Sequence, residues 1–264
     1  MGIVFLCGSH PRHAYIARQI AKSNLLTGLV VERREEFVPD PPAGLNAHTR
    51  DLYVAHFAGR AAAEERFFAK TELPAGVGTL FIEQSELNTA PVGEFIDRHK
   101  PELLMSYGVH KLSEETLGRA HGRRWNIHGG LSPWYRGGIT LFWPSYFLEP
   151  QMSGMTVHNL TQAIDGGDIV HTVVAKLVRG DGLHDLACRA VVAVGEDLPK
   201  LVTAGVQNTF NTPVVQKTSG RIWRAVDWRP EHLHLIYDVY GNRIVDRYLD
   251  GEFMKREPKL VSGV

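Results

Sequence analysis

The first thirty-two residues alternate a short apolar run, an amphipathic segment and a second apolar run. The runs at 3–6 and 28–32 have the length and composition of buried strands, and residues 13–23 between them repeat apolar side chains at helical spacing. A strand, a helix and a second strand within about thirty residues form a βαβ unit, which places both strands in a parallel sheet. We therefore expect an α/β, Rossmann-like fold whose sheet is mostly parallel.

Later segments continue this pattern. Further strands are expected at 79–82, 103–107, 125–128, 156–160 and 169–178, and helices at 49–70, 91–99, 140–146 and 183–204. The stretch 33–76, charged at its start and then proline-rich, is predicted to be an insertion that either shapes a substrate site or only packs. We expect one main domain over 1–205 and a small α+β subdomain over 206–264, with a helix at 230–238 and strands at 243–248 and 253–256.

Composition excludes several classes of protein. The 29 basic residues balance 29 acidic residues, which argues against nucleic-acid binding through bulk charge. The two cysteines, Cys7 and Cys188, are too few for a disulfide framework or a cysteine-rich zinc site. The chain has no apolar stretch long enough to cross a membrane, and its first residues lack a basic leader. The expectation is a cytoplasmic protein that acts on a small molecule, without nucleic-acid or membrane partners.

Common motifs of catalysis are missing. The first strand is followed by Gly8 but not by a G-x-G-x-x-G pattern, and no Walker A loop or G-x-S-x-G nucleophile motif occurs. The pairs His10 with His13 and His48 with His56 do not form a known metal-binding pattern with acidic residues or cysteines. These pairs are therefore not expected to bind a metal.

The positive signal lies between residues 125 and 168. Asn126 and His128 are two residues apart at the end of a predicted strand, so their side chains face the same side. Asp165 follows in a glycine-rich turn, where it could bend back toward them. An amide and an imidazole at the carboxyl edge of a sheet can bind an oxyanion and accept a proton. Taken singly, each residue could also be a strand-end cap, a core histidine or an ordinary turn residue.

This stretch resembles the formyltransferases that use 10-formyltetrahydrofolate, which include glycinamide ribonucleotide, methionyl-tRNA and sugar-amine formyltransferases. The family motif is Asn-x-His, a Leu-x-Pro-x-x-(Arg)-Gly loop and then Asp-x-Gly. Residues 126–128, 131–137 and 165–167 match it in order and spacing, and so do Gly154, Thr156 and His158 before the aspartate. The chain departs from the family where Gly129-Gly130 replaces Pro-Ser and Ser132 replaces Leu, which puts the affinity for the cofactor in question.

The resemblance implies transfer of a formyl group from 10-formyltetrahydrofolate to an amine. Asn126 and His128 would stabilise the formyl oxygen, His128 would also carry the proton released by the amine, and Asp165 would orient His128. His158 would lie just behind them or serve packing alone. The cosubstrate would contact backbone groups of two loops and the residue after the histidine, and the residues implied are Val109, His110, Lys111, Leu112, Gly129, Ile164 and Gly166.

The acceptor is expected to bind where the first strand meets the first helix. Ser9, His10 and Arg12 lie there, and a helix N-terminus favours an anion such as a phosphate or a carboxylate, although an ordinary capped turn would have the same sequence. The tail is too short for the C-terminal barrel of a tRNA-acting member. A nucleotide-linked amino sugar is the preferred acceptor. The alternatives are a hydroxyornithine-type siderophore amine, a 10-formyltetrahydrofolate hydrolase and a non-catalytic folate-binding module. Trp223 and Trp228 in the tail would face either a core or a homodimer partner.

Overall fold

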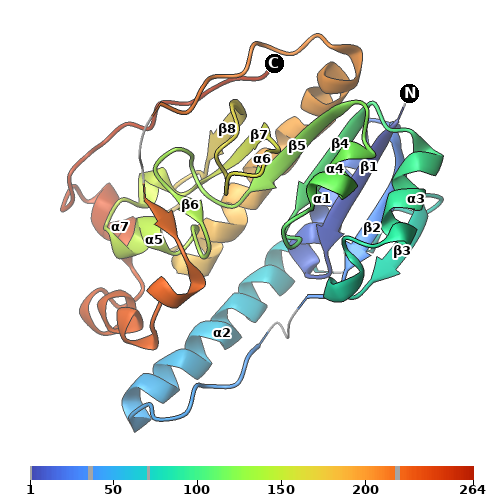
Figure 1. Ribbon diagram of the computed structural model, residues 1–264. Helices are drawn as coiled ribbons and strands as arrows, with labels where there is room; N and C mark the ends of the chain where they lie inside the picture. The colour runs from blue at the N-terminus through green and yellow to red at the C-terminus, as the bar shows by residue number, and fades with distance from the viewer. Residues whose placement is uncertain (1, 35–37, 70–71, 218–220) are drawn as a thin grey trace.

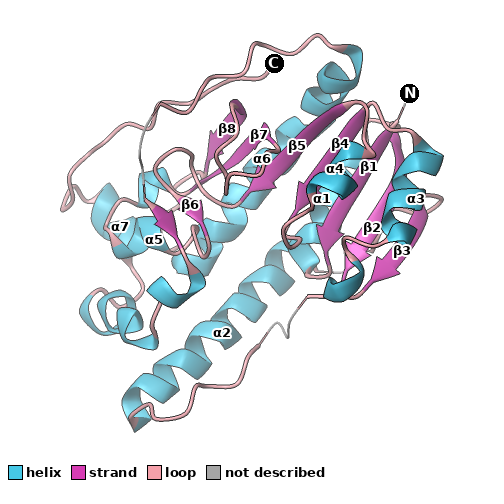
Figure 2. Cartoon of the chain, in the orientation of Figure 1, coloured by secondary structure: helices cyan, strands magenta, loops and turns pink. Residues whose placement is uncertain are grey.

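The computed structural model describes residues 2–34, 38–69, 72–217 and 221–264. Its centre is a mixed sheet of seven strands in the order β3-β2-β1-β4-β5-β7-β8 (Figure 1, Figure 2). These strands are β1 (Ile3–Gly8), β2 (Leu26–Glu32), β3 (Gly78–Ile82), β4 (Leu103–Tyr107), β5 (Arg123–His128), β7 (Gly154–Asn159) and β8 (Ile169–Val174). The first five are parallel, and β7 and β8 pair antiparallel with their neighbours. The expected α/β fold with a mostly parallel sheet is confirmed.

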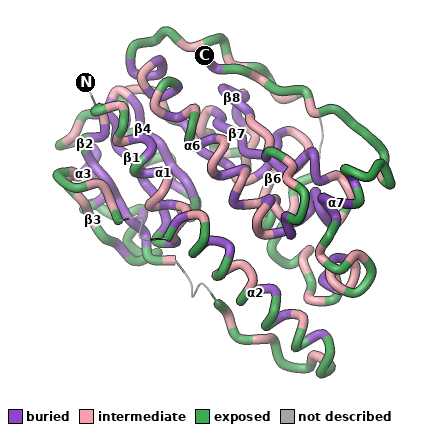
Figure 3. The backbone as a smooth tube through the Cα atoms, turned by 180° about the vertical axis from the view of Figure 1, so that it is seen from behind, coloured by how far each residue is buried: buried purple, intermediate pink, exposed green. Residues whose placement is uncertain are grey.

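Helices cover both faces of the sheet. On one face α1 (Pro11–Ala21) and α6 (Leu183–Gln207) pack against each other and over the sheet, and on the other lie α3 (Ala90–His99) and the short α4 (Glu114–Gly118). Alternation along β1 explains this, because Ile3, Phe5 and Cys7 enter the core of the first face while Val4 and Leu6 enter the second. Figure 3 shows the buried strands between more exposed outer helices.

The segment between β2 and β3 carries the helix α2 (Ala47–Phe68), which extends beyond the sheet (Figure 1). Its C-terminal part packs against α1 and α6, and a third apolar cluster joins α2 to residues 131–152 and to the chain after 222. The predicted insertion at 33–76 includes residues 35–37 and 70–71, and the predicted helix at 49–70 ends at residue 70. These residues lie outside the described part of the chain. The proposed division at 205 remains a prediction.

The C-terminal region differs from its sequence-based prediction. The strand predicted at 243–248 is wrong, because the chain forms α7 (Ile244–Leu249) there, and the strand predicted at 253–256 is irregular. Asp246 explains the helix: it is buried, accepts a hydrogen bond from the Gly180 backbone (2.7 Å) and pairs with Arg243 three residues earlier. The helix predicted at 230–238 is a 3₁₀ turn (Pro230–His232) followed by a π-helix (Leu235–Val239).

Trp223 and Trp228 contact groups within the same chain. Trp223 lies in β9 (Ile222–Trp223), which pairs with β6 (Arg136–Gly137), and its ring stacks on Trp143 of α5 (Trp143–Tyr146) at 4.3 Å between centroids. Trp228 packs beside Tyr53 of α2. Both tryptophans therefore belong to the third apolar cluster. Among the described residues, no helix combines the length and apolarity that crossing a membrane requires.

Candidate active site

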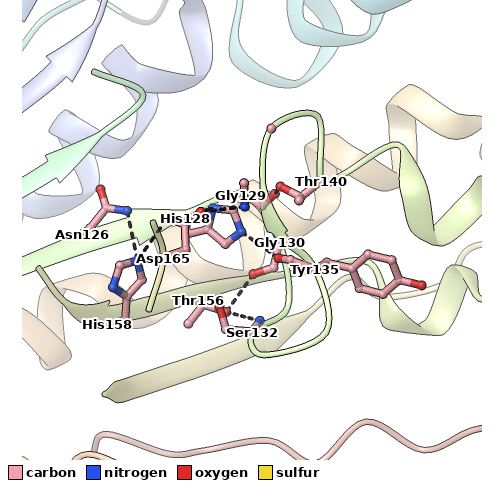
Figure 4. A network of polar contacts seen from close by, with 12 residues as sticks. Asn126, His128, Gly129, Gly130, Ser132, Tyr135, Thr140, Thr156, His158 and Asp165 are labelled. Atoms are coloured by element: carbon pink, nitrogen blue, oxygen red, sulfur yellow. Dashed lines mark hydrogen bonds and ion pairs between the residues drawn. The ribbon is translucent and has the colours of Figure 1, made fainter. Parts of the chain in front are cut away.

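Strand register brings polar side chains of three strands together at the carboxyl end of β5. Ser106 of β4 is paired with Asn126 of β5, and Asn126 is paired with His158 of β7. The next position on the same face of β5 is His128, which is paired with Thr156. Residues in one row across a sheet project to one face, so the sheet itself aligns these groups (Figure 4).

Hydrogen bonds along this row determine how the Asn126 amide points. The Ser106 hydroxyl donates to Asn126 Oδ1 (2.7 Å), so Asn126 Nδ2 faces His158 Nε2 at 3.1 Å. His158 Nδ1 lies 2.8 Å from the Asn159 carbonyl oxygen, which can only accept a hydrogen bond. His158 therefore carries a proton on Nδ1 and accepts from Asn126 at Nε2. One of the two Asn126 N–H groups is used in this way, and the other can serve a ligand.

His128 is buried and contacts polar groups at both ring nitrogens. Its Nε2 lies 2.8 Å from the Tyr135 carbonyl oxygen and must donate to it, while Nδ1 lies 3.3 Å from Asp165 Oδ2. Burial lowers the pKa of His128, and the attraction of Asp165 and the bond to Tyr135 oppose that effect only in part. The imidazole is therefore neutral near pH 7, with the unprotonated Nδ1 beside a carboxylate that would hold an incoming proton.

Asp165 lies 37 positions after His128 in the chain but reaches it through the turn that follows β7. Its backbone has a φ of +43°, in the left-handed region that few residues other than glycine adopt. Its carboxylate contacts His128, accepts from the Gly137 backbone N–H (2.8 Å), and lies 3.4 Å from His158 Nε2. Burial opposes ionisation, but the positive charge that His128 and His158 can carry and the Gly137 backbone N–H lower the pKa of Asp165 to about 2. The carboxylate is thus ionised under all ordinary conditions.

The loop after β5 is held against the site by two threonines. Thr156 Oγ1 accepts from the Ser132 backbone N–H (2.9 Å) and donates to the Gly130 carbonyl (2.7 Å), and Thr140 Oγ1 donates to the Gly129 carbonyl. These bonds bring the Tyr135 carbonyl back to His128 (Figure 4). The loop therefore decides which nitrogen of His128 carries the proton.

The residues predicted to contact a cofactor fall into two groups. Val109 and Leu112 pack against the second core cluster, Lys111 is exposed, and His110 is held at the end of β2 by Glu32, which accepts from its backbone N–H (2.9 Å) and contacts its ring. Gly129, Ile164 and Gly166 lie beside the Asn126–His128–Asp165 site, and the Ile164 side chain is exposed. Their roles in binding remain predictions.

The residues predicted to bind an acceptor lie at the start of α1, apart from the Asp165 turn in the sequence. Ser9 is exposed and its hydroxyl accepts from the Arg34 backbone (3.0 Å), while His10 is buried. The Arg12 guanidinium forms an ion pair with Glu64 of α2 and lies 3.2 Å from His10 Nδ1. Glu64 thus neutralises the charge that the sequence suggested for an anion, and anion binding here remains a prediction.

Comparisons with solved structures place this architecture among known proteins. The chain superposes on a phosphoribosylglycinamide formyltransferase from Anaplasma phagocytophilum with a TM-score of 0.57 and 18% identity, covering 85% of this chain and 98% of that one. A sugar N-formyltransferase from a Shewanella species gives a TM-score of 0.57 at 16% identity, with 89% and 87% covered. The chain has the formyltransferase fold.

A third match is informative for its ligands. An N-formyltransferase from Helicobacter canadensis, solved with folinic acid and dTDP-3-aminofucose, has a TM-score of 0.53 at 14% identity, with 87% of this chain and 73% of that chain covered. No family model matches the sequence. Sugar-acting and glycinamide-ribonucleotide-acting proteins of this fold are similar to the chain to the same degree, so the comparisons establish the fold and leave the acceptor open.

The formyltransferase fold of this chain includes site residues that the sequence did not indicate. Gln216 Nε2 donates to the carbonyls of Asp165 (2.8 Å) and Gly167 (2.6 Å), and so holds the turn that carries the carboxylate. On the same turn, the buried Nε2 of Gln162 has no hydrogen-bond partner among the described residues. An unpaired amide donor near the exposed Ile164 side chain fits a planar heterocycle with polar edges, such as a pterin. No motif in the sequence distinguishes Gln216 or Gln162.

Proposed function

We propose that this protein transfers a formyl group from 10-formyltetrahydrofolate to the primary amine of a small molecule, with Asn126, His128 and Asp165 as its catalytic residues. The observation that carries the proposal is the 3.3 Å contact between His128 Nδ1 and Asp165 Oδ2, on the same face of β5 as Asn126, within a formyltransferase fold. When bound, the folate would supply the activated formyl group. The turn at 162–167 and the loop at 108–112 would hold it.

The chain's own groups divide the remaining work. The free N–H of Asn126 would donate to the formyl oxygen, where negative charge develops, and it is oriented beforehand by Ser106 and His158. The amine must lose a proton as it becomes an amide. Nδ1 of the neutral His128 would accept this proton, and the adjacent Asp165 carboxylate would stabilise the imidazolium that results. The proton would then pass to the folate nitrogen that loses the formyl group, which leaves His128 neutral again.

For the acceptor, we propose an amino sugar linked to a nucleotide. This rests on the substrates of several structural neighbours, among them the Helicobacter canadensis protein with its bound dTDP-3-aminofucose, and on the expected anion site at the start of α1. The helix α2, whose Glu64 meets Arg12, would form part of the wall of the acceptor site.

The experiment follows loss of the formyl group from 10-formyltetrahydrofolate by absorbance, with and without a panel of amines. The panel contains nucleotide-linked amino sugars, glycinamide ribonucleotide and N-hydroxyornithine, and His128→Ala serves as the inactive control. We expect acceleration by an amino sugar and formation of its N-formyl product. Acceleration by another amine would overturn the acceptor, formate release without any amine would indicate a hydrolase, and folate binding without turnover would indicate a binding module.

A further inference from the structure

Three side chains that commonly ligate metals meet on the surface near the start of α2. They are His48, His234 and Asp238, and one ligand atom from each lies within 4.8 Å of the other two. Asp238 Oδ2 lies 3.0 Å from His48 Nε2 and 2.6 Å from His234 Nδ1. His48 and Asp238 are separated by 190 positions in the chain, which is why neither histidine suggested a ligand set from the sequence.

The cluster is distinct from the candidate active site. The candidate active site lies at the end of β5. The cluster lies at the N-terminal end of α2, which is the end of this helix that is remote from the sheet (Figure 1, Figure 3). His48 and Asp238 are exposed and His234 is half-buried, so an ion can enter from solvent and keep a position open to water.

The groups behind His234 hold it in the orientation that a ligand needs. Its Nε2 lies 2.9 Å from the hydroxyl of Thr49, which is 1% exposed. Thr49 is itself held because its backbone N–H donates to Asn46, the residue that caps α2 (2.9 Å). In the metal-free protein Nδ1 donates to the Asp238 carboxylate, so Nε2 accepts from the Thr49 hydroxyl. When Nδ1 gives up this proton to bind a metal, Nε2 can carry the proton and donate it to Thr49. Metal-binding histidines usually have such a partner at the second nitrogen.

The backbone supports the same interpretation. Asp238 lies within the π-helix Leu235–Val239, and His234 is its N-cap residue. A π-helical turn is rare in proteins in general, but where it occurs it is often at a functional site. Two imidazoles and one carboxylate are the ligands of open zinc sites, whereas Mg²⁺ and Ca²⁺ prefer oxygen ligands alone.

We propose that His48, His234 and Asp238 bind one Zn²⁺ ion, with water in the fourth position, and that this ion connects α2 to the C-terminal segment. In the metal-free protein the Asp238 carboxylate bridges the two imidazoles. On binding, each of the three donates a lone pair to the ion, and any proton on the two ligating nitrogens is released to solvent. The site lies outside the formyl-transfer machinery, so it does not depend on the proposed function.

The test uses the full chain without a polyhistidine tag, freed of metal with a chelator and titrated with Zn²⁺ by calorimetry. We expect one ion per chain and a higher melting temperature when Zn²⁺ is present. His48→Ala or Asp238→Ala should abolish both effects, and Thr49→Val, which keeps all three ligands, should weaken binding about 10-fold to 100-fold. His121→Ala is the matched control, because His121 is an exposed histidine outside the cluster.

Co²⁺ supplies an independent readout, since a tetrahedral site with nitrogen and oxygen ligands should develop visible absorption that His48→Ala removes. The melting temperature of each variant without metal shows that the variant folds. The proposal is wrong if Zn²⁺ affinity is unchanged in the His48 and Asp238 variants, or if His121→Ala lowers it equally. It is also wrong if one ion binds per two chains with dimer formation.

Discussion

At the scale of single residues, the site is a chain of hydrogen bonds whose directions are mutually determined. Ser106 orients Asn126, Asn126 donates to His158, and the Tyr135 carbonyl takes the Nε2 proton of His128. The remaining lone pair, at His128 Nδ1, faces Asp165. The neighbours of His128 therefore determine which of its nitrogens carries the proton. The Asp165 carboxylate stabilises the imidazolium that forms when Nδ1 takes up a second proton.

Asp165→Asn tests this coupling directly. Removing a preorganised charge should raise the barrier by about 3–4 kcal/mol, which lowers turnover at least about a hundredfold. Asp165 attracts a proton to His128, so its loss should lower the pKa of His128 further. Neutral His128 is the active base, and its pKa already lies below the ordinary 6.5, so the acid limb of kcat/KM should lie below that value. The limb should move to still lower pH in the variant.

Measuring pH–rate profiles for both proteins with one amine cancels the titration of the amine itself. Asp168→Asn is the matched control, since it removes a nearby carboxylate, whereas the carboxylate that contacts His128 is that of Asp165. Equal turnover of the Asp165 variant and wild type, with folate still bound, would contradict the assigned role.

At the scale of elements, the loop after β5 leaves no room for a side chain at one of its two glycines. A Cβ on Gly130 would lie 2.5 Å from the Tyr135 carbonyl oxygen and 2.6 Å from His128 Nε2, which would disturb the bond that orients the ring. A Cβ on Gly129 would meet only Leu141 side-chain atoms at 3.5 Å or more and Met155 at 3.9 Å, which is ordinary contact. The Gly-Gly pair thus consists of one required and one replaceable glycine.

Gly130→Ala should therefore lower stability by about 1–3 kcal/mol, the usual effect of overpacking, and reduce turnover by at least about tenfold. Gly129→Ala should behave like wild type in both respects. Chemical denaturation measures the stability and the formyl-loss assay measures the turnover of both variants. Equal results for the two variants would contradict the difference between Gly129 and Gly130.

At the scale of the whole molecule, several histidines are buried in neutral form. Burial lowers the pKa of His13 well below its ordinary value, that of His184 to about 4 and that of His56 to about 2, and it also lowers the pKa of His128. The ring centroids of His56 on α2 and His184 on α6 lie 4.5 Å apart, and the ring of His13 packs against Tyr107 at the end of β4. Protonation therefore opposes packing in several parts of the molecule at once.

The sign of the pH effect follows from these shifts. In the unfolded chain each histidine takes up a proton near its ordinary pKa of 6.5, whereas in the folded protein it does so at lower pH. The unfolded state thus binds more protons below about pH 6.5, and the free energy of unfolding should fall as pH decreases from there, by at most about 1.4 kcal/mol per pH unit for each group.

Denaturation by urea between about pH 7 and pH 5 measures this slope. His56→Phe removes one buried titrating group that packs against Phe57 and Trp228, so it should flatten the slope whatever it does to stability at pH 7. A slope unchanged by this variant would show that His56 does not contribute.

The sequence by itself determined the parallel sheet, its main strands and the shared face of Asn126 and His128, because these depend on local periodicity along one strand. It also suggested Asp165. Only the tertiary structure decided that a left-handed turn, held by Gln216, brings this carboxylate to His128, that Glu64 neutralises Arg12, and that His48 meets His234 and Asp238. It likewise made residues 244–249 a helix, through the burial of Asp246 against Gly180. Each of these depends on contacts between segments far apart in the chain, and local patterns carry no information about such contacts.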